Sequence, residues 1–385
     1  MGREDIRLTV GGRRFDGIDV LRGLSIVAVV LHHTNLHMLF DGHSFANRLP
    51  GQLNRILFWN GANGVTVFFA ISGFLITTMS LRRWGSLGAV RPGAFYRLRF
   101  ARIAPLLLTL LAVLSVLDLA HVQGYAINPA RATLPRALVA ALTFHVNWLE
   151  AHHGYLPGNW DVLWSLSIEE VFYFAFPLLC RVTRGRWPLY ALWAGFAVLG
   201  PFSRTVFSHN PLWRDYNYLS GMDGIALGCL AAVAAANVRI PPRWLAPLQV
   251  AGAALMLLVT MARPWVRALE LDRTGLDVTV LALGTCLVML ATAERSRTGG
   301  RNGGLGTAAL RWFGRNSYEV YLTHMFLVTG GVQIFVDARI PDAWGPLWYA
   351  AILLLAGVLG WMVARFYSEP MNRRLREGTP RVAIS

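Results

Sequence analysis

The sequence predicts an all-α integral membrane protein, a polytopic bundle of about ten transmembrane helices with both termini in the cytosol. Of its 385 residues, 55% are hydrophobic and only 15% are charged. The apolar residues occur in unbroken blocks, each near the roughly 20 residues that a helix needs to cross a bilayer core. This composition excludes a disordered chain. The net charge of +15 does not indicate a nucleic-acid-binding domain, because such domains are less apolar.

The predicted spans follow the apolar blocks along the chain. The stretch 134–149 is weaker because it contains Arg136 and His145, so we predict an interfacial or re-entrant helix there. The ten blocks lie at residues 20–40, 62–80, 103–120, 163–180, 188–206, 219–236, 245–262, 276–293, 316–336 and 347–367.

The distribution of basic residues predicts the orientation. All 36 are arginines; with the N-terminus in the cytosol, 25 lie in cytosolic segments, 10 in external ones, and Arg22 within the first span. Because cytosolic loops carry the excess of positive charge, both termini are expected in the cytosol. We predict a cytosolic tail at 1–15, a membrane domain at 16–370 and a basic cytosolic tail at 371–385. No small-residue cleavage site follows the first block, so no cleavable signal peptide is expected.

The cysteines and histidines do not predict a metal site. Cys180, Cys229 and Cys286 each lie within or at the end of an apolar block, and no two have metal-ligand spacing. We expect them to be small buried residues without disulfides. His33 and His324 have no cysteine or paired carboxylate at ligand spacing, so no metal is predicted there either.

The first span contains ionisable residues, which are costly in a membrane and therefore candidates for function. Arg22 and His33 are 11 residues apart, about three helical turns, so they share one face. The rise of about 16 Å places Arg22 at the cytosolic end and His33 near the middle of the membrane. His32 points about 100° away. The alternative is a buried, hydrogen-bonded histidine and an arginine that extends to the interface.

The segments around the third span contain a second group of candidates. Arg97, Arg99 and Arg102 precede the span, and Arg99 and Arg102 are three residues apart, so their guanidinium groups face the same way. Such a pair suits phosphate oxygens, although it is also typical of a cytosolic anchor. Ser72 and Gly73 in the second span are candidates for the same site, or small residues that allow close helix packing.

Two further spans place candidates near the depth of His33. Glu169 lies about 9 Å below the outer edge of the fourth span, which leaves about 5 Å of depth between it and His33 in a 30 Å core. A carboxylate and an imidazole at one level can act as an acid–base pair. His324 in the ninth span is also expected near mid-depth. Glu369 is expected to pair with a cytosolic arginine.

Six motifs follow one another along the chain: Asp19-x-x-Arg22 with His33, the block 68–76, the runs 95–103, 164–173 and 317–324, and Glu369-Pro370. Their order resembles the acyltransferase-3 family of bacterial membrane O-acyltransferases, in its stand-alone form without an attached hydrolase-like domain. The resemblance covers about residues 16–375. One departure is Gly221-Met222-Asp223, where relatives often carry Arg-x-Asp, so only Asp223 matches.

The resemblance implies transfer of an acyl group, usually acetyl, from acyl-coenzyme A to a hydroxyl of a sugar in a cell-surface glycan or glycolipid. It also implies a multi-pass protein of the bacterial inner membrane, with acyl-coenzyme A as co-substrate and no tightly bound cofactor. His33, Glu169 and His324 are the predicted catalytic residues, and His33 would act as a base or carry the acyl group. The predicted donor site consists of Arg22, Arg97, Arg99, Arg102, Ser72 and Gly73.

The acceptor is less well defined by the sequence. We predict contacts from Asp223, Tyr173, Trp164 and Trp160, within or near loops that also contain Trp148, Tyr155, Asn159 and Asp161. These aromatic residues suit stacking on sugar rings, but they are equally typical of a membrane interface. One alternative function is acylation of a small secondary metabolite such as a macrolide sugar. A more distant one is a transporter or flippase of a lipid-linked sugar, although we find no internal repeat.

Overall fold

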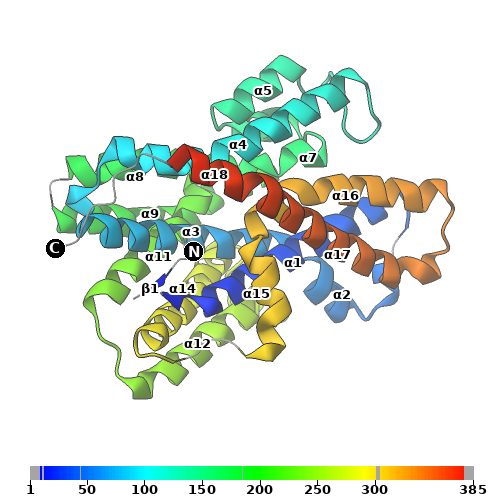
Figure 1. Ribbon diagram of the computed structural model, residues 1–385. Helices are drawn as coiled ribbons and strands as arrows, with labels where there is room; N and C mark the ends of the chain where they lie inside the picture. The colour runs from blue at the N-terminus through cyan, green and yellow to red at the C-terminus, as the bar shows by residue number, and fades with distance from the viewer. Residues whose placement is uncertain (1–8, 11–12, 44, 184, 301–303, 377–385) are drawn as a thin grey trace.

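The computed structural model describes residues 9–10, 13–43, 45–183, 185–300 and 304–376 (Figure 1). These residues form eighteen α-helices. Ten are long: α1 (Asp16–Phe40), α3 (Gly61–Trp84), α4 (Pro92–Leu119), α8 (Leu163–Val182), α9 (Arg186–Val206), α11 (Tyr218–Asn237), α12 (Pro242–Met261), α14 (Leu276–Arg297), α16 (Ser317–Asp337) and α17 (Gly345–Val363).

Shorter elements connect the long helices. Thr9–Val10 (β1) and Arg13–Arg14 (β2) form a small antiparallel pair, and a π-helical turn at Ala364–Ser368 joins α17 to α18. The short helices are α2 (Gly51–Phe58), α5 (Leu134–Leu142), α6 (Val146–His153), α7 (Gly158–Asp161), α10 (Pro211–Tyr216), α13 (Arg263–Ala268), α15 (Ala308–Arg315) and α18 (Glu369–Arg376). Single 3₁₀ turns lie at Phe45–Arg48, Leu87–Ala89, Leu305–Thr307 and Asp342–Trp344.

The predicted all-α membrane architecture is confirmed. In the described part of the chain, nine helical stretches are long and apolar enough to cross a membrane, and they include every long helix except α9. The sequence predicts a span at 188–206, and α9 does occupy it, packed against α11. However, α9 contains Pro201 and the charged Arg204, which lower its mean hydropathy.

The predicted tails and interfacial helix take specific forms. The stretch 134–149 contains two short helices, α5 and α6, and the chain between them turns at Phe144, whose φ is +58°. The N-terminal tail includes the β1–β2 pair, while its residues 1–8 and 11–12 lie outside the described residues. The C-terminal tail is helical to Arg376, and residues 377–385 also lie outside them.

Small residues bring the long helices into backbone contact. At the crossing of α3 and α11, a Cβ on Gly73 would lie 1.9 Å from the carbonyl oxygen of Ile225, and one on Gly228 would lie 2.0 Å from that of Ala70. Only glycine fits at such a separation, as is common where membrane helices cross. Gly73 therefore contributes to helix packing, the alternative role that the sequence allowed.

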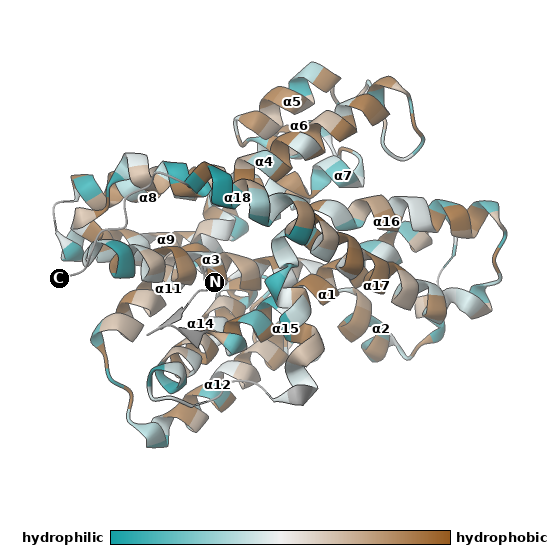
Figure 2. Ribbon diagram, in the orientation of Figure 1, coloured by the Kyte–Doolittle hydropathy of each residue, from teal (hydrophilic) through white to brown (hydrophobic). Residues whose placement is uncertain are grey.

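A separate lobe stands beside the main bundle. Helices α5, α6 and α7 gather at the top of Figure 1 against the C-terminal half of α4 and the start of α8. They share a core of leucine, alanine and valine side chains with the fully buried Trp160. Figure 2 shows apolar residues along the long helices, whereas α18 is strongly polar. The lobe thus covers one part of the bundle, and α18 lies across another.

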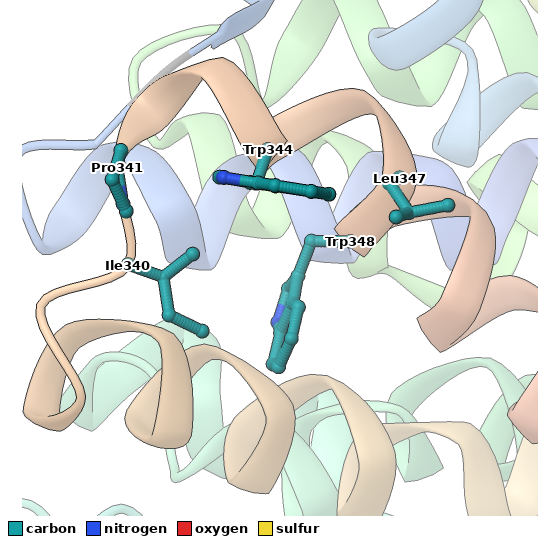
Figure 3. Close-up of a pocket in the computed structure, with 5 residues that line it drawn as sticks. All are labelled: Ile340, Pro341, Trp344, Leu347 and Trp348. Atoms are coloured by element: carbon teal, nitrogen blue, oxygen red, sulfur yellow. The ribbon is translucent and has the colours of Figure 1, made fainter.

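An apolar pocket lies where α16 connects to α17. Ile340, Pro341, Trp344, Leu347 and Trp348 line it (Figure 3). The indole of Trp348 donates a hydrogen bond to the carbonyl of Gly331, 2.9 Å away. Because every lining side chain is apolar or an indole, this pocket does not supply acid, base or anion-binding groups for a reaction.

The close crossing of α3 and α11 gives a stability prediction. Replacement Gly73→Ala forces the two backbones apart and should lower stability by about 1–3 kcal/mol, the typical cost of overpacking. The matched control is Gly195→Ala in α9, where no atom lies within 4 Å of the added Cβ. The control should be neutral or slightly stabilising, because alanine favours helix. Thermal unfolding in detergent micelles measures both, and equal midpoints would contradict the packing role of Gly73.

Candidate active site

Helices α1 and α16 run side by side from the same end of the bundle. The guanidinium of Arg22 donates from Nε to the hydroxyl of Ser317, at the start of α16, over 3.0 Å. Further along both helices, His33 meets His324. A Cβ on Gly158 of α7 would lie 3.2 Å from Nε2 of His37, one turn beyond His33. These contacts define three levels, from an arginine-rich end, through the histidines, to the end covered by α7.

The two histidines form a hydrogen-bonded pair whose direction follows from its surroundings. Nδ1 of His33 lies 2.9 Å from Nε2 of His324, while Nδ1 of His324 lies 2.8 Å from the carbonyl oxygen of Tyr321. A carbonyl only accepts, so with both rings neutral His324 carries its proton on Nδ1 and accepts at Nε2. His33 therefore donates from Nδ1, and its Nε2 keeps a free lone pair. His324 is fully buried, whereas His33 is partly exposed.

Glu169 binds different residues from those expected. Its carboxylate accepts hydrogen bonds from the hydroxyls of Ser72 and Tyr173. Among the described residues, no hydrogen bond or ion pair joins it to His33. The position of Glu169 in the sequence predicted only its depth along α8. It could not fix the direction of the side chain around the helix axis, which points to α3 instead of α1.

The arginine-rich end contains guanidinium groups from three segments. Arg99 lies 3.6 Å from the ring centre of Tyr173 and 3.9 Å from the carboxylate of Glu170. Arg102 forms an ion pair with the buried Glu319 over 2.8 Å. Arg376, from α18, lies within electrostatic range of both and also of Arg83, from the end of α3.

Not all predicted donor residues join this cluster. Arg97 is exposed and donates from Nε to the backbone carbonyl of Leu375, 3.3 Å away. Arg22 lies on Ser317 of α16 instead. Ser72 faces Glu169, and Gly73 lies in the α3–α11 crossing.

Two arginines of the cluster, Arg83 and Arg376, were not predicted from the sequence. Only the fold shows that the end of α3 and the polar α18 converge on the start of α4. Glu369 pairs with an arginine, Arg373, over 3.8 Å.

The four predicted acceptor residues lie in separate places. Trp164 stacks on Tyr216 with ring centres 4.0 Å apart, near α7. Trp160 is fully buried in the core of the lobe, and Tyr173 lies beside Arg99 at the other end. Only Trp164 has a partly exposed ring beside the end covered by α7.

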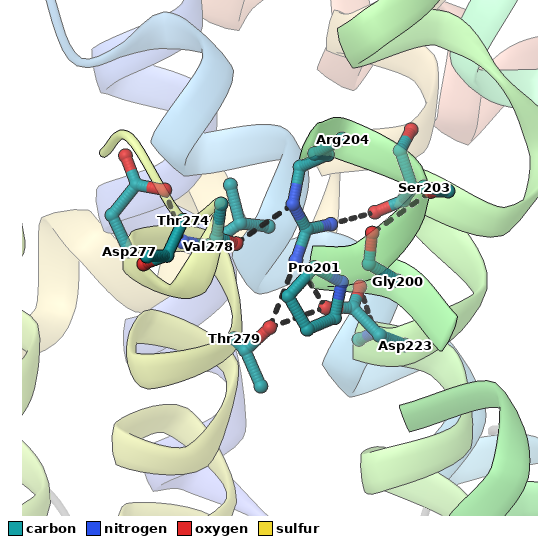
Figure 4. A network of polar contacts seen from close by, with 12 residues as sticks. Gly200, Pro201, Ser203, Arg204, Asp223, Thr274, Asp277, Val278 and Thr279 are labelled. Atoms are coloured by element: carbon teal, nitrogen blue, oxygen red, sulfur yellow. Dashed lines mark hydrogen bonds and ion pairs between the residues drawn. The ribbon is translucent and has the colours of Figure 1, made fainter. Parts of the chain in front are cut away.

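Asp223 belongs to a buried network between α9, α11 and α14 (Figure 4). Its carboxylate accepts from the guanidinium of Arg204 and from the hydroxyl of Thr279, each over 2.7 Å. Arg204 also donates to the carbonyl of Gly275. Position 221 is glycine, so the guanidinium beside Asp223 comes from another helix. Both charged side chains are almost fully buried, and the network joins three helices.

A pair of carboxyl groups lies at the end covered by α7, and the sequence analysis missed one of them. Glu150 of α6 is fully buried and accepts a hydrogen bond at Oε1 from the backbone N–H of Leu156, 3.1 Å away. Asp161 lies beside it and accepts from the hydroxyl of Tyr216 over 3.2 Å. Burial raises the pKa of Glu150 well above its ordinary value, and the charge of Asp161 raises it further. The two groups can therefore share one proton.

The described residues contain no group of three or more histidine, cysteine or acidic side chains that could hold a metal ion. The cysteines Cys180, Cys229 and Cys286 are all buried with free thiols, as predicted.

The raised pKa of Glu150 makes a prediction about stability. An acid whose pKa is higher in the folded than in the unfolded protein takes up a proton on folding. The folded protein therefore becomes less stable as the pH rises above about 4.3, the ordinary pKa of a glutamate. Glutamine keeps the acceptor for Leu156 without this penalty. Glu150→Gln should therefore raise the unfolding midpoint at pH 8, on the order of 2 °C, with little change at pH 4.

Thermal unfolding in detergent at both pH values measures this effect. The matched control is Glu270→Gln, at a carboxylate whose side chain is 63% exposed and whose partner Arg273 lies 3.7 Å away. The control should shift the midpoint equally at the two pH values. A lower midpoint for Glu150→Gln at pH 8 would contradict a protonated Glu150.

Comparison with known proteins points to one family. The family model described as an acyltransferase domain matches residues 15–366. The peptidoglycan O-acetyltransferase OatA of Listeria monocytogenes is 25% identical over 379 residues, which cover 92% of this chain and 55% of that protein. The O-acetyltransferase OatA of Staphylococcus aureus is 27% identical over 178 residues, 43% of this chain and 25% of that protein. The chain thus spans about half the length of the Listeria relative. No solved structure matches.

Proposed function

The chain belongs to the acyltransferase-3 family of membrane acyltransferases, and from that premise we propose that it moves an acyl group, most simply acetyl, from acyl-coenzyme A to a sugar hydroxyl of a cell-surface glycan or glycolipid. The observation that carries the proposal is the His33–His324 pair, which lies between the arginine-rich end and an end lined by aromatic and carboxyl groups. The relatives named above are O-acetyltransferases, which supports acetyl as the group and a hydroxyl as the acceptor.

The donor belongs at the arginine-rich end. Guanidinium groups bind phosphate oxygens through directed, charge-assisted hydrogen bonds. Arg99 and Arg102 project from one face of α4, and Arg83 and Arg376 approach from two other segments. The phosphates of coenzyme A supply the matching negative charge. We propose that this end faces the cytosol, where acyl-coenzyme A is found, in a bacterial cytoplasmic membrane.

The chemistry then centres on Nε2 of His33, whose lone pair is free in the hydrogen-bonded tautomer. The hydroxyl of the acceptor gives its proton to this nitrogen while its oxygen attacks the thioester carbonyl. The carbon–sulfur bond breaks, and the thiolate takes the proton from His33, so that an ester and free coenzyme A result. His324 holds the ring and its tautomer in place. The alternative route has His33 carry the acyl group before it reaches the acceptor.

Glu169 takes a supporting role in this scheme. Its carboxylate holds the hydroxyls of Ser72 and Tyr173, and Tyr173 stacks under Arg99. Glu169 also lies within electrostatic range of Tyr321, whose ring centre is 5.9 Å from that of His324, so this group extends from Arg99 toward the histidine pair. We propose that they position the donor instead of exchanging a proton with His33.

Loss of the base gives the first functional test. His33→Ala should reduce the rate of acyl transfer by about 10²–10⁴-fold, the usual contribution of a general base. Coenzyme A binding should persist, because the arginine cluster is untouched. Transfer of labelled acetyl from acetyl-coenzyme A in inverted membrane vesicles measures the rate.

The control for this test is His32→Ala, since His32 binds the backbone carbonyl of Phe58 and not His324. Its rate should stay close to that of the unchanged protein. If turnover survives in His33→Ala, the base must be another group, and His324 is then the better candidate.

Removal of one guanidinium tests the donor site. Arg99→Ala should weaken binding of coenzyme A by about 10- to 100-fold, because a hydrogen bond between charged groups contributes about 1.5–3 kcal/mol. Isothermal titration of the protein in nanodiscs with coenzyme A measures the affinity. The control is Arg273→Ala, at an arginine whose side chain is 81% exposed. Unchanged affinity in Arg99→Ala would remove this residue from the donor site.

A further inference from the structure

The end covered by α7 carries a polar and aromatic cluster that the acyl-transfer chemistry does not use. The carboxyl groups of Glu150 and Asp161 lie together there, and the hydroxyl of Tyr216 donates to Asp161 over 3.2 Å. The ring of Tyr216 stacks on Trp164 with an interplanar angle of 8°. We call these four residues the α7 cluster.

The α7 cluster lies close to the histidine pair. A Cβ on Gly158 would lie 2.4 Å from Cε of Met325 and 3.2 Å from Nε2 of His37, so α7 packs directly against α16 and α1. Met325 follows His324 in the chain, and His37 lies one turn beyond His33. Asp161 ends the same short helix that Gly158 begins. Tyr321, whose ring centre lies 5.9 Å from that of His324, is within electrostatic range of Asp161 and Glu150, so the α7 cluster lies on the side of the lobe that faces the histidine pair.

A buried amide on α7 has unused bonding capacity. Glu150 is 0% exposed, and its bonding capacity is used by the N–H of Leu156 and by the proton that it shares with Asp161. Asn159, on α7 two residues before Asp161, is 1% exposed, and neither atom of its amide finds a partner among the described residues. Buried polar atoms are normally hydrogen-bonded, so unpaired ones at one place point to a missing polar ligand or water. Asp161, Tyr216 and Trp164 are partly exposed and give access to the cluster.

We propose that the α7 cluster is the acceptor subsite, and that it selects an uncharged sugar ring over an anionic one. This inference rests on the proposed acyl transfer and adds the chemical class of the acceptor. The C–H face of a sugar ring packs on the partly exposed aromatic surface of Trp164 and Tyr216. A ring hydroxyl donates to the carboxylate of Asp161, a charge-assisted hydrogen bond.

The charge of the pair gives the selectivity. When Glu150 and Asp161 share one proton, the cluster keeps one negative charge in a mostly buried place. A carboxylate or phosphate on the sugar ring would lie next to that charge in a medium of low dielectric, where repulsion is strong. Hydroxyl and amide hydrogens of an uncharged ring are instead attracted. Removal of the charge from Asp161 should therefore weaken binding of uncharged sugars.

Sugar binding without any acyl donor tests the inference independently of catalysis. The probes are a trisaccharide of N-acetylglucosamine, which is uncharged, and a hyaluronan tetrasaccharide, which carries carboxylates. Saturation-transfer NMR with the full-length protein in nanodiscs measures binding of each. The unchanged protein should bind the uncharged probe and bind the anionic one at least about tenfold more weakly.

Three variants locate the site. Asp161→Asn should weaken binding of the uncharged trisaccharide by about tenfold, the effect of losing a hydrogen bond to a charged group. Tyr216→Phe keeps the stacked ring, removes only the hydroxyl, and should weaken binding by less. The control is Asp215→Asn, next to Tyr216, whose carboxylate is 63% exposed and pairs with Arg214. It should bind as the unchanged protein does.

The outcomes separate this inference from the proposed function. Equal binding in Asp161→Asn and the unchanged protein, equal binding of both probes, or no binding of either probe would overturn the acceptor subsite, even if acyl transfer to some acceptor is observed. Binding that depends on Asp161, in a protein that transfers no acyl group, would instead overturn the proposed transferase activity alone. Thermal unfolding of each variant shows that it is folded, and Tyr216→Phe provides a second test if Asp161→Asn is not.

Discussion

The hydrogen bond between His33 and His324 is the contact around which the rest of the site is arranged. Two imidazoles inside a membrane bundle are stable only if their polar nitrogens find partners, because an unpaired polar group is expensive there. His324 meets this need by donating to the carbonyl of Tyr321 in its own helix. That single bond sets the tautomer of His324, which sets the tautomer of His33. Helices α1 and α16 must consequently keep one register, and the contact of Arg22 with Ser317 at their common end holds it.

The same constraint explains why the other charges are paired across helices. Arg102 of α4 reaches Glu319 of α16, and Arg204 of α9 reaches Asp223 of α11. An ion pair buried in a bundle gains little net stability, since desolvation offsets the attraction. A single partner left alone would, however, be strongly destabilising. Other arrangements of the helices would leave one buried charge without its partner, so such pairs make those arrangements energetically unfavourable. This argument applies most strongly to Arg204, whose four donated hydrogen bonds all go to described groups of α11, α14 or the loop before α14.

Much of the architecture was predictable from the sequence, but the direction in which each side chain points around its helix axis was not. Block length and helical spacing placed Arg22 and His33 on one face and put His324 near the depth of His33, and the structure joins the two histidines. Spacing along α8 gave only the depth of Glu169, and its partners Ser72 and Tyr173 depend on how α8 is rotated against α3. Glu150 lay unnoticed in a weakly apolar stretch, because nothing local indicates that α6 folds back onto Asp161. The contact between the guanidinium of Arg204 and Asp223 could not be predicted either, because the two residues are 19 positions apart on different helices.

The separation between the arginine cluster and the histidines limits what the donor can be. Glu319, which holds Arg102, precedes His324 by five residues on α16, a rise of about 8 Å. A compact anionic donor such as an acyl phosphate, bound by the guanidinium groups, would keep its reactive carbon at their level and away from Nε2 of His33. A donor with its charge at one end and its acyl group on a flexible arm spans the gap without moving either site. Acyl-coenzyme A has this form, and Glu169, which holds Ser72 and Tyr173, lies within electrostatic range of Tyr321 beside His324. The geometry of the cluster and the proposed donor therefore support each other through length as well as charge.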